Sequence, residues 1–198
     1  MKTLYFDCFA GANGDMILGA MVAAGVDANF LREQLSRLPV KGFSIDFKTV
    51  NRSGLSATYA RVETAHEHKH RHLANIRQII EGSALSDAVK QRAVQIFTRL
   101  AEAEARVHNE PIEHVHFHEV GALDAIVDVV GAAICFDALQ IGRFISSPLH
   151  VGSGMVKMAH GQFPIPPPAV IEMLKGVPFY ATEIRGELLT PTGAAIIT

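Results

Sequence analysis

The residues best suited to chemistry lie in one short stretch of the chain, residues 114–128. It holds three histidines that alternate with apolar residues, so an extended backbone would direct their rings to one side. Three carboxylates follow, two of them four residues apart and therefore on one face of the helix expected there. The histidines are His114, His116 and His118, and the acids are Glu119, Asp124 and Asp128. Nitrogen and oxygen donors at this density predict a site for a borderline divalent ion, whereas the two cysteines of the chain disfavour a thiolate-rich zinc site.

A structural interpretation of the same residues stays open. Acids in the first turn of a helix complement its dipole without a metal, and paired histidines at a strand end can be hydrogen-bonded structure. The helix around Asp128 is apolar on most sides, however, so a carboxylate there is costly unless it is paired or bound to a cation. We therefore hypothesise that His116, His118 and Glu119 bind the ion. Asp124 or Asp128 would ligate it or orient a histidine, and one of the three carboxylates would act in proton transfer.

A second set of candidates lies in a glycine-rich loop between an expected strand, 3–9, and an expected helix that starts near Met16. Strand, glycine loop and helix present backbone amides to an anion, but the spacing is not that of a Walker phosphate loop. Acidic side chains in the loop would repel a bare phosphate, so they suit a metal or a substrate hydroxyl better. The alternative is that Asn13 or Asp15 only caps the helix. The candidate binding residues are Asp7, Gly11, Gly14 and Asp15.

Two further segments combine histidine with loop-forming residues. Residues 66–72 place a histidine at every second position with basic residues between, a pattern that fits a metal-collecting loop, an anion- or substrate-covering flap, or a solvated linker. Later in the chain, Gly152 and Gly154 form a flexible glycine pair ahead of His160 and the proline-rich run 164–168. Because such a run is stiff, it suits the rim of a pocket. We expect Gly152, Gly154 and His160 to contact the substrate.

The elements that must position these residues predict a mixed α/β fold. A long scaffold helix is expected from Asp87 to about Val107 with Ser86 as its N-cap, and a core helix follows Asp124. Shorter helices are expected near 16–22, 31–38 and 169–175. The strand patterns predict a small mixed sheet flanked by helices, with an antiparallel hairpin whose place in that sheet is open. The expected strands are 3–9, 43–49, 57–64, 144–147 and 177–182.

Length and composition fit one large globular domain or two small ones. The chain has 198 residues, 48% of them hydrophobic, and a net charge of -2 that gives no reason to expect nucleic acid or an anionic membrane as a partner. No apolar stretch reaches the ~20 residues of a membrane span, and the first residues lead into a strand pattern rather than a signal peptide. Cys8 and Cys135 fit reduced core thiols of a cytoplasmic protein, with ligation by Cys8 beside Asp7 as the alternative.

Four motifs, in the same order along the chain, resemble the LarC family of nickel insertion proteins. They are Asp7–Gly11 with Gly14–Met16, His116–Ala122 with Asp124 and Asp128, His160–Gly161 with its proline run, and Glu187–Gly193. The resemblance covers nearly the whole chain. It implies insertion of Ni²⁺ into pyridinium-3,5-bisthiocarboxylic acid mononucleotide, which gives the nickel-pincer cofactor of lactate racemase and related enzymes. It also implies CTP hydrolysis, with Mg²⁺ or Mn²⁺, during formation of the nickel–carbon bond.

The chain departs from the family pattern in two respects. Ala10, Ala12 and Asn13 stand where many members have serine or another small residue. The family also has a C-terminal domain, with which we associate CTP, so residues 1–198 are expected to be the single N-terminal metal-binding domain. The last helix, starting near Pro191, stops soon after it begins, as in a fragment or a split-gene product. The resemblance therefore implies a separate C-terminal partner polypeptide, and the oligomeric state, a homo-oligomer included, stays open.

Two other functions fit the same residues. One is nickel storage or delivery without turnover, which would use the histidines of residues 66–72. The other is a metal-dependent hydrolase, in which the cluster at 114–128 activates water. For the nickel-inserting protein itself, the loop Gly11–Gly14 and the loop around His160 would hold the nucleotide phosphate and ring.

Overall fold

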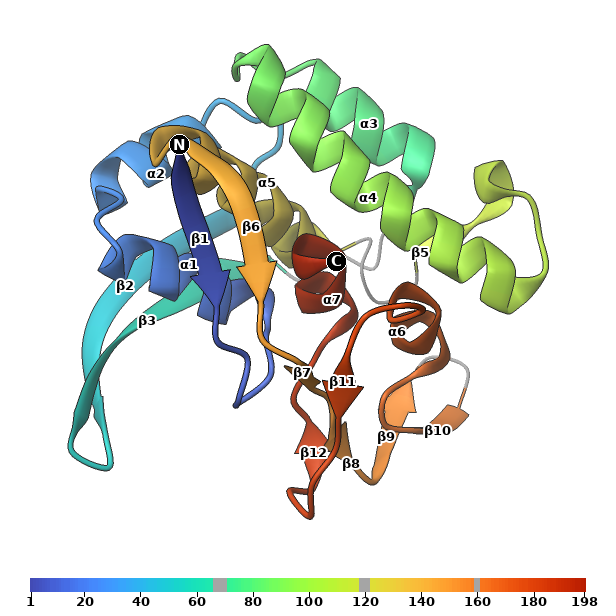
Figure 1. The fold of residues 1–198 in the computed structure, drawn as a ribbon. Helices are drawn as coiled ribbons and strands as arrows, with labels where there is room; N and C mark the ends of the chain where they lie inside the picture. Colours follow the sequence, from blue (N-terminus) through green and yellow to red (C-terminus); the bar gives the residue numbers. More distant parts are fainter. Residues whose placement is uncertain (66–70, 118–121, 159–160) are drawn as a thin grey trace.

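Helix α5, most of whose residues are buried, lies at the centre of the fold (Figure 1). The computed structural model describes residues 1–65, 71–117, 122–158 and 161–198. Every residue of α5 from Val129 to Phe136 is buried, and a helix that is apolar all round must be enclosed by protein. Helix α5 spans Leu123–Ala138, and several other helices pack against it. They are α1 (Gly14–Ala23), α2 (Ala28–Leu35), α4 (Asp87–His108) and α7 (Pro191–Ile197).

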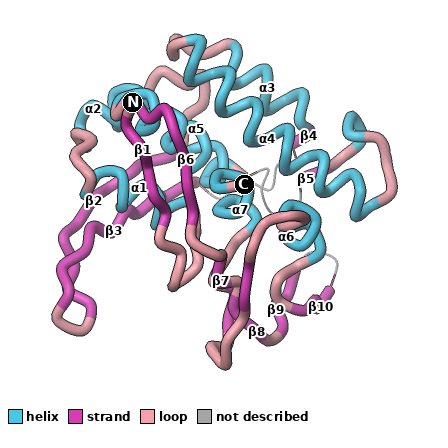
Figure 2. Tube along the Cα trace, in the orientation of Figure 1, coloured by secondary structure: helices cyan, strands magenta, loops and turns pink. Residues whose placement is uncertain are grey.

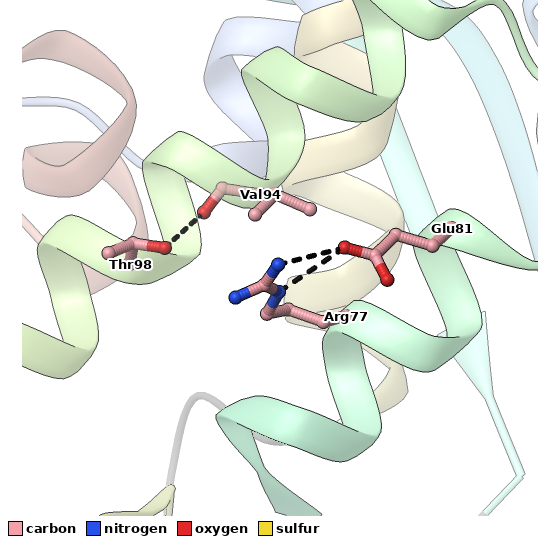
Figure 3. Close-up of polar contacts among 4 residues, drawn as sticks. All are labelled: Arg77, Glu81, Val94 and Thr98. Carbon is pink, nitrogen blue, oxygen red and sulfur yellow. Dashed lines mark hydrogen bonds and ion pairs between the residues drawn. The ribbon is translucent and has the colours of Figure 1, made fainter. Parts of the chain in front are cut away.

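Helices α3 (Leu73–Glu81) and α4 lie side by side, and α4 packs on α5 (Figure 1). The long helix begins as predicted, because the Ser86 hydroxyl accepts a hydrogen bond from the Val89 amide at 3.4 Å. It ends at Asn109, which takes a left-handed conformation with φ of 52°. Side-chain contacts also form within each of these helices. Figure 3 shows the Arg77–Glu81 ion pair of α3 and the hydrogen bond from the Thr98 hydroxyl to the Val94 carbonyl of α4.

Strands β1 (Lys2–Phe6) and β6 (Ile141–Ser146) form a parallel pair that brings the two halves of the chain together. Aromatic rings fix this pair to α5. Phe136 lies 6.2 Å from Phe6 and 5.0 Å from Phe144 between ring centroids, both in edge-to-face arrangements. The pair therefore places the glycine loop after β1 beside the helical core.

Strands β2 (Phe43–Arg52) and β3 (Leu55–Thr64) form the predicted antiparallel hairpin. Ser53 and Gly54 both have positive φ, which suits the tight turn of a twisted hairpin. The far end of the hairpin extends away from the body of the protein (Figure 1). Its near half packs on α1, where Gly19 lies so close to the carbonyl of Thr58 that a side chain on it would overlap that oxygen. The contact fixes residues 58–62 next to the start of α1.

The remaining elements are short, and those between residue 149 and residue 187 gather below the helices (Figures 1 and 2). Antiparallel pairs join β4 to β5, β8 to β12 and β9 to β10, and a parallel pair joins β7 to β11. Their bounds are β4 (Arg71–His72), β5 (His116–Phe117), β7 (Leu149–His150), β8 (Gly152–Ser153), β9 (Met155–Met158), β10 (Gly161–Pro164), β11 (Phe179–Tyr180) and β12 (Gly186–Glu187). Two further helical elements are η1 (Ile112–His114) and α6 (Pro168–Met173). Within the described ranges, no helix is long and apolar enough to cross a membrane.

The mixed α/β class and the hairpin are confirmed, but the strands are distributed differently from the single small sheet that was expected. In the described part of the chain they form six two-stranded sheets (Figure 2). The hairpin stays apart because it packs on α1 instead of pairing with β1. The strand expected at 177–182 is reduced to β11, since Pro178 cannot donate a backbone hydrogen bond. The glycines expected to be flexible belong instead to β8 and the turn before β9.

A candidate cation-binding cleft

A cleft of about 390 Å³ opens where helix starts, the hairpin and the C-terminal segment meet. Four of its lining residues are acidic, and in the described part of the chain no lysine, arginine or histidine lines it. A cleft with one sign of charge concentrates ions of the opposite sign. The lining residues are Asn13, Gly14, Asp15, Tyr59, Ala60, Val62, Asp124, Asp128, Glu187, Thr190, Pro191 and Thr192.

Backbone hydrogen bonds hold the glycine loop and the C-terminal segment together as two walls of this cleft. The Ala12 amide donates to the Leu188 carbonyl at 2.9 Å, and the Thr190 amide donates to the Ala12 carbonyl at 3.2 Å. Gly11 has φ of +79° and lies against the Leu188 carbonyl, so a side chain at Gly11 would meet backbone. Two motifs that are far apart in sequence thus form one rigid structure, and Gly11 acts in it through the backbone.

Asp128 is the electrostatic centre of the cleft. Burial, followed by the negative charges of Asp15 and then Asp124, raises the pKa of its carboxyl from 3.8 to about 8. Asp15 of α1 and Asp124 of α5 therefore lie close enough to Asp128 for their charges to act on its carboxyl. One oxygen of Asp128, Oδ1, is buried without a hydrogen-bond partner. A buried, unpartnered carboxylate oxygen among other acids is stabilised by a proton or by a cation.

Gly14 is required for Asp128 to occupy this position. A Cβ atom built on Gly14 would overlap Oδ2 and Cγ of Asp128, although Gly14 itself has an ordinary helical backbone. The first residue of α1 therefore lacks a side chain for a packing reason: the Asp128 carboxylate fills the place where that side chain would be. The predicted site residues Gly14, Asp15, Asp124 and Asp128 are thus brought together by the fold.

The helix-capping interpretation of the loop is not supported by its hydrogen bonds. Asn13 is the N-cap residue of α1, but its side chain makes no capping bond, and its Oδ1 is buried without a partner. Asp15 accepts only from the neighbouring Met16 amide, at 2.8 Å. In the same way, Asp124 accepts from the Ala125 amide at 2.8 Å. Two buried oxygens, those of Asn13 and Asp128, are therefore left for a ligand.

Other predicted site residues lie elsewhere. Asp7 is exposed at the end of β1 and does not line the cleft. Gly152 packs against the Gly186 carbonyl and the Leu188 side chain, and Gly154 borders a separate hollow next to Arg185. These two glycines support the strand pairing behind the cleft wall, which is why their φ angles of +84° and +105° matter.

The histidine part of the predicted metal site is described only in part. His118, Glu119 and His160 lie outside the described residues, as do the first five residues of the 66–72 run. His116 is exposed on β5, where it lies opposite His72 and away from the cleft lining. Among the residues that the structure describes, no group of three or more His, Cys, Asp or Glu side chains is arranged to hold a metal ion. The acids of the cleft are near one another but do not converge on a point.

The cysteines behave as core thiols. Both are buried and free. Burial, and secondarily the charge of Asp7, raises the pKa of Cys8 to about 11, and burial raises the pKa of Cys135 to about 12. A thiol with so high a pKa is a poor metal ligand at neutral pH. The alternative role of Cys8 as a ligand is therefore disfavoured.

Sequence reasoning missed several residues of the cleft wall. Glu187, Thr190 and Thr192 belong to a motif that marks the family resemblance, and that motif was the available signal for their role. Tyr59 carried no such signal, because only the packing of the hairpin on α1 brings it to the cleft. His150 was also missed. It is a buried histidine whose Nδ1 donates to the Phe9 carbonyl at 2.7 Å and whose Nε2 contacts the Thr182 hydroxyl at 2.9 Å.

Fold and cleft together define a class: a mixed α/β protein with an acidic pocket suited to a cationic ligand. A family model described as "Nickel insertion protein" matches residues 4–198. The chain belongs to the nickel insertion protein family.

Curated relatives agree with this assignment. The chain is 51% identical over 198 residues to the pyridinium-3,5-bisthiocarboxylic acid mononucleotide nickel insertion protein of Desulfitobacterium hafniense, covering all of this chain and 49% of the relative. It is 47% identical over 208 residues to the protein of the same name from Acetivibrio thermocellus, covering all of this chain and 51% of the relative. The chain thus spans about half the length of the curated relatives it matches. No solved structure matches it.

Proposed function

We propose that the acidic cleft is where a pyridinium-3,5-bisthiocarboxylic acid mononucleotide receives Ni²⁺, giving the nickel-pincer cofactor of lactate racemase-type enzymes. The observation that carries this proposal is Asp128, a buried carboxylate with one unpartnered oxygen in a cleft lined by three other acids. The family membership of the chain and the names of its relatives supply the identity of the cation and of the organic substrate.

Carboxylate ligands suit an ion that has to be handed over. Ni²⁺ accepts oxygen and imidazole nitrogen readily but binds softer sulfur donors well. Asp15, Asp124 and Asp128 would therefore attract the ion and release it to the two sulfurs and the carbon of the substrate. We retain His116, His118 and Glu119 as proposed ligands that receive the incoming ion before it enters the cleft.

A carboxylate of the cleft would also accept the proton that the substrate loses. Formation of the nickel–carbon bond breaks a ring C–H bond, and the proton needs an acceptor; no oxidant or reductant is involved. Asp128 is suited to this role because its pKa of about 8 lies near neutral pH. A cation in the cleft favours the ionised carboxylate, and departure of the product restores the protonated form. Asp124 and Glu119 are the other proposed proton acceptors.

Tyr59 offers an aromatic face to the substrate ring. It is the aromatic residue among the described lining residues, and 42% of its surface is exposed. A pyridinium ring is both aromatic and cationic, so it can stack on Tyr59 while the acids opposite balance its charge. The glycine loop, with Gly11 and Gly14, would hold the remainder of the nucleotide, and Gly152, Gly154 and His160 stay proposed contacts from the neighbouring loops, as Asp7 does at the end of β1.

CTP, with Mg²⁺ or Mn²⁺, we assign to the half of the longer relatives that this chain does not span. In support, Asp15 stands at the amide end of α1, where a bare phosphate would otherwise bind. We propose that the chain acts with a C-terminal partner polypeptide as a cyclometallase of the lyase class.

The test is product formation by this chain together with a polypeptide that supplies the rest of the relatives' length, with Ni²⁺, CTP and the organic substrate. Asp128→Asn should lower the rate by about 100-fold or more, because it removes the proton acceptor. Asp137→Asn is the matched control, since Asp137 is an exposed acid on the same helix. Product formation by Asp128→Asn at the wild-type rate would refute the proposal. Turnover of simple phosphoesters with metal alone would favour a hydrolase instead.

A further inference from the structure

Two histidines from distant parts of the chain lie against each other outside the cleft. The short strands β4 and β5 are antiparallel, and His72 lies directly opposite His116 in their register. The centroids of the two imidazole rings are 3.9 Å apart, with 48° between the ring planes. Opposite residues on neighbouring strands point to the same face. Residues from either side of a 44-residue separation, 72 to 116, thus present two imidazoles on one surface.

The hydrogen bond of His72 fixes which nitrogen of its ring is available. Nδ1 of His72 lies 3.1 Å from the Val115 carbonyl oxygen. Since a carbonyl oxygen only accepts, Nδ1 carries the proton and Nε2 of the neutral ring carries the lone pair. Val115 is fully buried, and the His72 amide is held by Oδ1 of Asn75 at 3.1 Å, so both ends of this bond are fixed. A histidine that donates one N–H to a backbone carbonyl is oriented as metal-ligating histidines are.

We propose that His72 and His116 form a two-histidine binding site for Ni²⁺ or a similar borderline divalent ion, separate from the acidic cleft. Imidazole nitrogen is a preferred ligand of such ions, and neither residue lines the cleft. Two protein ligands leave the other coordination positions to water, so the ion is held loosely and can exchange. The role of this site as a supply of nickel to the cleft rests on the function proposed above. The binding of the ion by the two histidines does not rest on it.

Charge around the pair is compatible with a cation. The neighbouring cation on β4, Arg71, is buried, whereas His72 is half-buried. Successive residues of a strand point to opposite faces, so the Arg71 side chain leaves β4 on the face opposite to that of His72. The alternative for the pair is a tilted contact between two imidazole rings with no ligand, and metal binding separates the two interpretations.

The experiment measures Ni²⁺ binding to the whole chain by equilibrium dialysis and calorimetry. His72→Ala and His116→Ala should each weaken the Kd of the same single equivalent by at least about tenfold, because each removes one of its two ligands. The double variant should lose no more bound Ni²⁺ than the single variants lose, because both histidines belong to one site. His114→Ala is the matched control, since it removes an exposed imidazole two residues from His116 and should change nothing. Unchanged stoichiometry and Kd in both single variants would overturn the proposal.

A second measurement on the unaltered chain guards against misfolded variants. Substoichiometric Ni²⁺ should broaden the imidazole NMR signals of His72 and His116, while those of His150 stay sharp because both of its nitrogens are engaged in buried hydrogen bonds. Signals of His72 and His116 that persist at one equivalent of Ni²⁺ would refute the site. Asp128→Asn separates this site from the cleft: it should lower the rate of product formation by about 100-fold or more while leaving Ni²⁺ binding by the two histidines in place.

Discussion

Replacing Asp128 by asparagine should change how the stability of the protein depends on pH. The folded protein holds the Asp128 proton up to a pKa of about 8, whereas the ordinary pKa of the group is 3.8. Below pH 3.8 the carboxyl is protonated in both states, and the group has no effect on the free energy of unfolding. As the pH rises above that value, the unfolded chain ionises freely while the folded chain does not. The unfolded state is therefore favoured increasingly until the folded carboxyl ionises near pH 8.

The size of the effect follows from one proton. Between about pH 5 and pH 7 the folded wild-type protein binds one more proton at this site than the unfolded chain, so its free energy of unfolding falls by about 1.4 kcal/mol per pH unit from this group. Asparagine has no such titration. The stability of Asp128→Asn relative to wild type should therefore rise by roughly 2.7 kcal/mol across that interval. The slope is nearly the same for any folded pKa of Asp128 that lies about one unit or more above pH 7.

The assay is urea denaturation of both proteins at several pH values in the interval, without added metal and followed by circular dichroism. The difference between the two free energies of unfolding is plotted against pH, which cancels every titration that the proteins share. Asp137→Asn is the control, because its exposed carboxyl on the same helix should give a difference that stays flat. Repeating the series with saturating Ni²⁺ should reduce the slope, since a cation in the cleft favours the ionised carboxylate.

A flat difference between wild type and Asp128→Asn would refute the reasoning. It would mean that Asp128 is ionised in the folded protein throughout the interval, and that water or a hydrogen-bond donor satisfies the buried Oδ1. The acid would then have neither the proton affinity nor the need for a cation on which the proposed function depends.

Four further predictions concern the same site and the core. Gly14→Ala should destabilise the wild-type protein by about 1–3 kcal/mol because of its overlap with Asp128, and should cost clearly less in an Asp128→Ala background; equal costs in a double-mutant cycle of urea denaturation would contradict the contact. Asp15→Asn should lower the pKa of Asp128, because the charge of Asp15 raises that pKa more than the charge of Asp124 does. Carboxyl NMR titration should show the change, and an unchanged pKa would contradict the interaction. Tyr59→Ala should raise KM for the organic substrate about 3- to 30-fold with Tyr59→Phe close to wild type, whereas equal effects of both variants would point to the hydroxyl group instead of the ring. Cys8 in the folded protein should react with iodoacetamide at pH 8 about 100-fold more slowly than in urea, and equal rates would contradict its burial.

The sequence alone predicted those features that depend on residues near one another in the chain. The apolar pattern around Asp128 predicted a buried helix, and the cost of a carboxylate inside such a helix predicted the need for a pairing partner or a cation. The long helix after Ser86 and the hairpin were predicted for the same reason, since capping, periodicity and turn residues are read from neighbouring positions. These features hold in the structure with small changes in their bounds.

What the sequence could not give is the set of long-range contacts. Nothing near Gly14 indicates that the side chain filling its missing Cβ position belongs to Asp128, and nothing near Ala12 indicates pairing with Leu188 and Thr190. The predicted strand pairing was wrong for the same reason. Periodicity shows which residues of a strand are buried but not which strand lies beside it. His116 was expected to act with residues that follow it in sequence, whereas the structure places His72 opposite it.

The same contacts explain how the cleft for which we propose nickel binding can stay folded before an ion enters it. A cluster of ionised acids would destabilise an empty cleft, but burial lets Asp128 keep a proton near neutral pH, so the repulsion it would add is absent until a cation arrives. Proton and cation are then alternative occupants of one carboxylate, and Gly14 leaves room for it at the start of α1. A reaction that consumes a cation and liberates a proton needs such a group: the residue that gives up its proton to admit Ni²⁺ is ready to take one from the substrate when the ion moves to carbon.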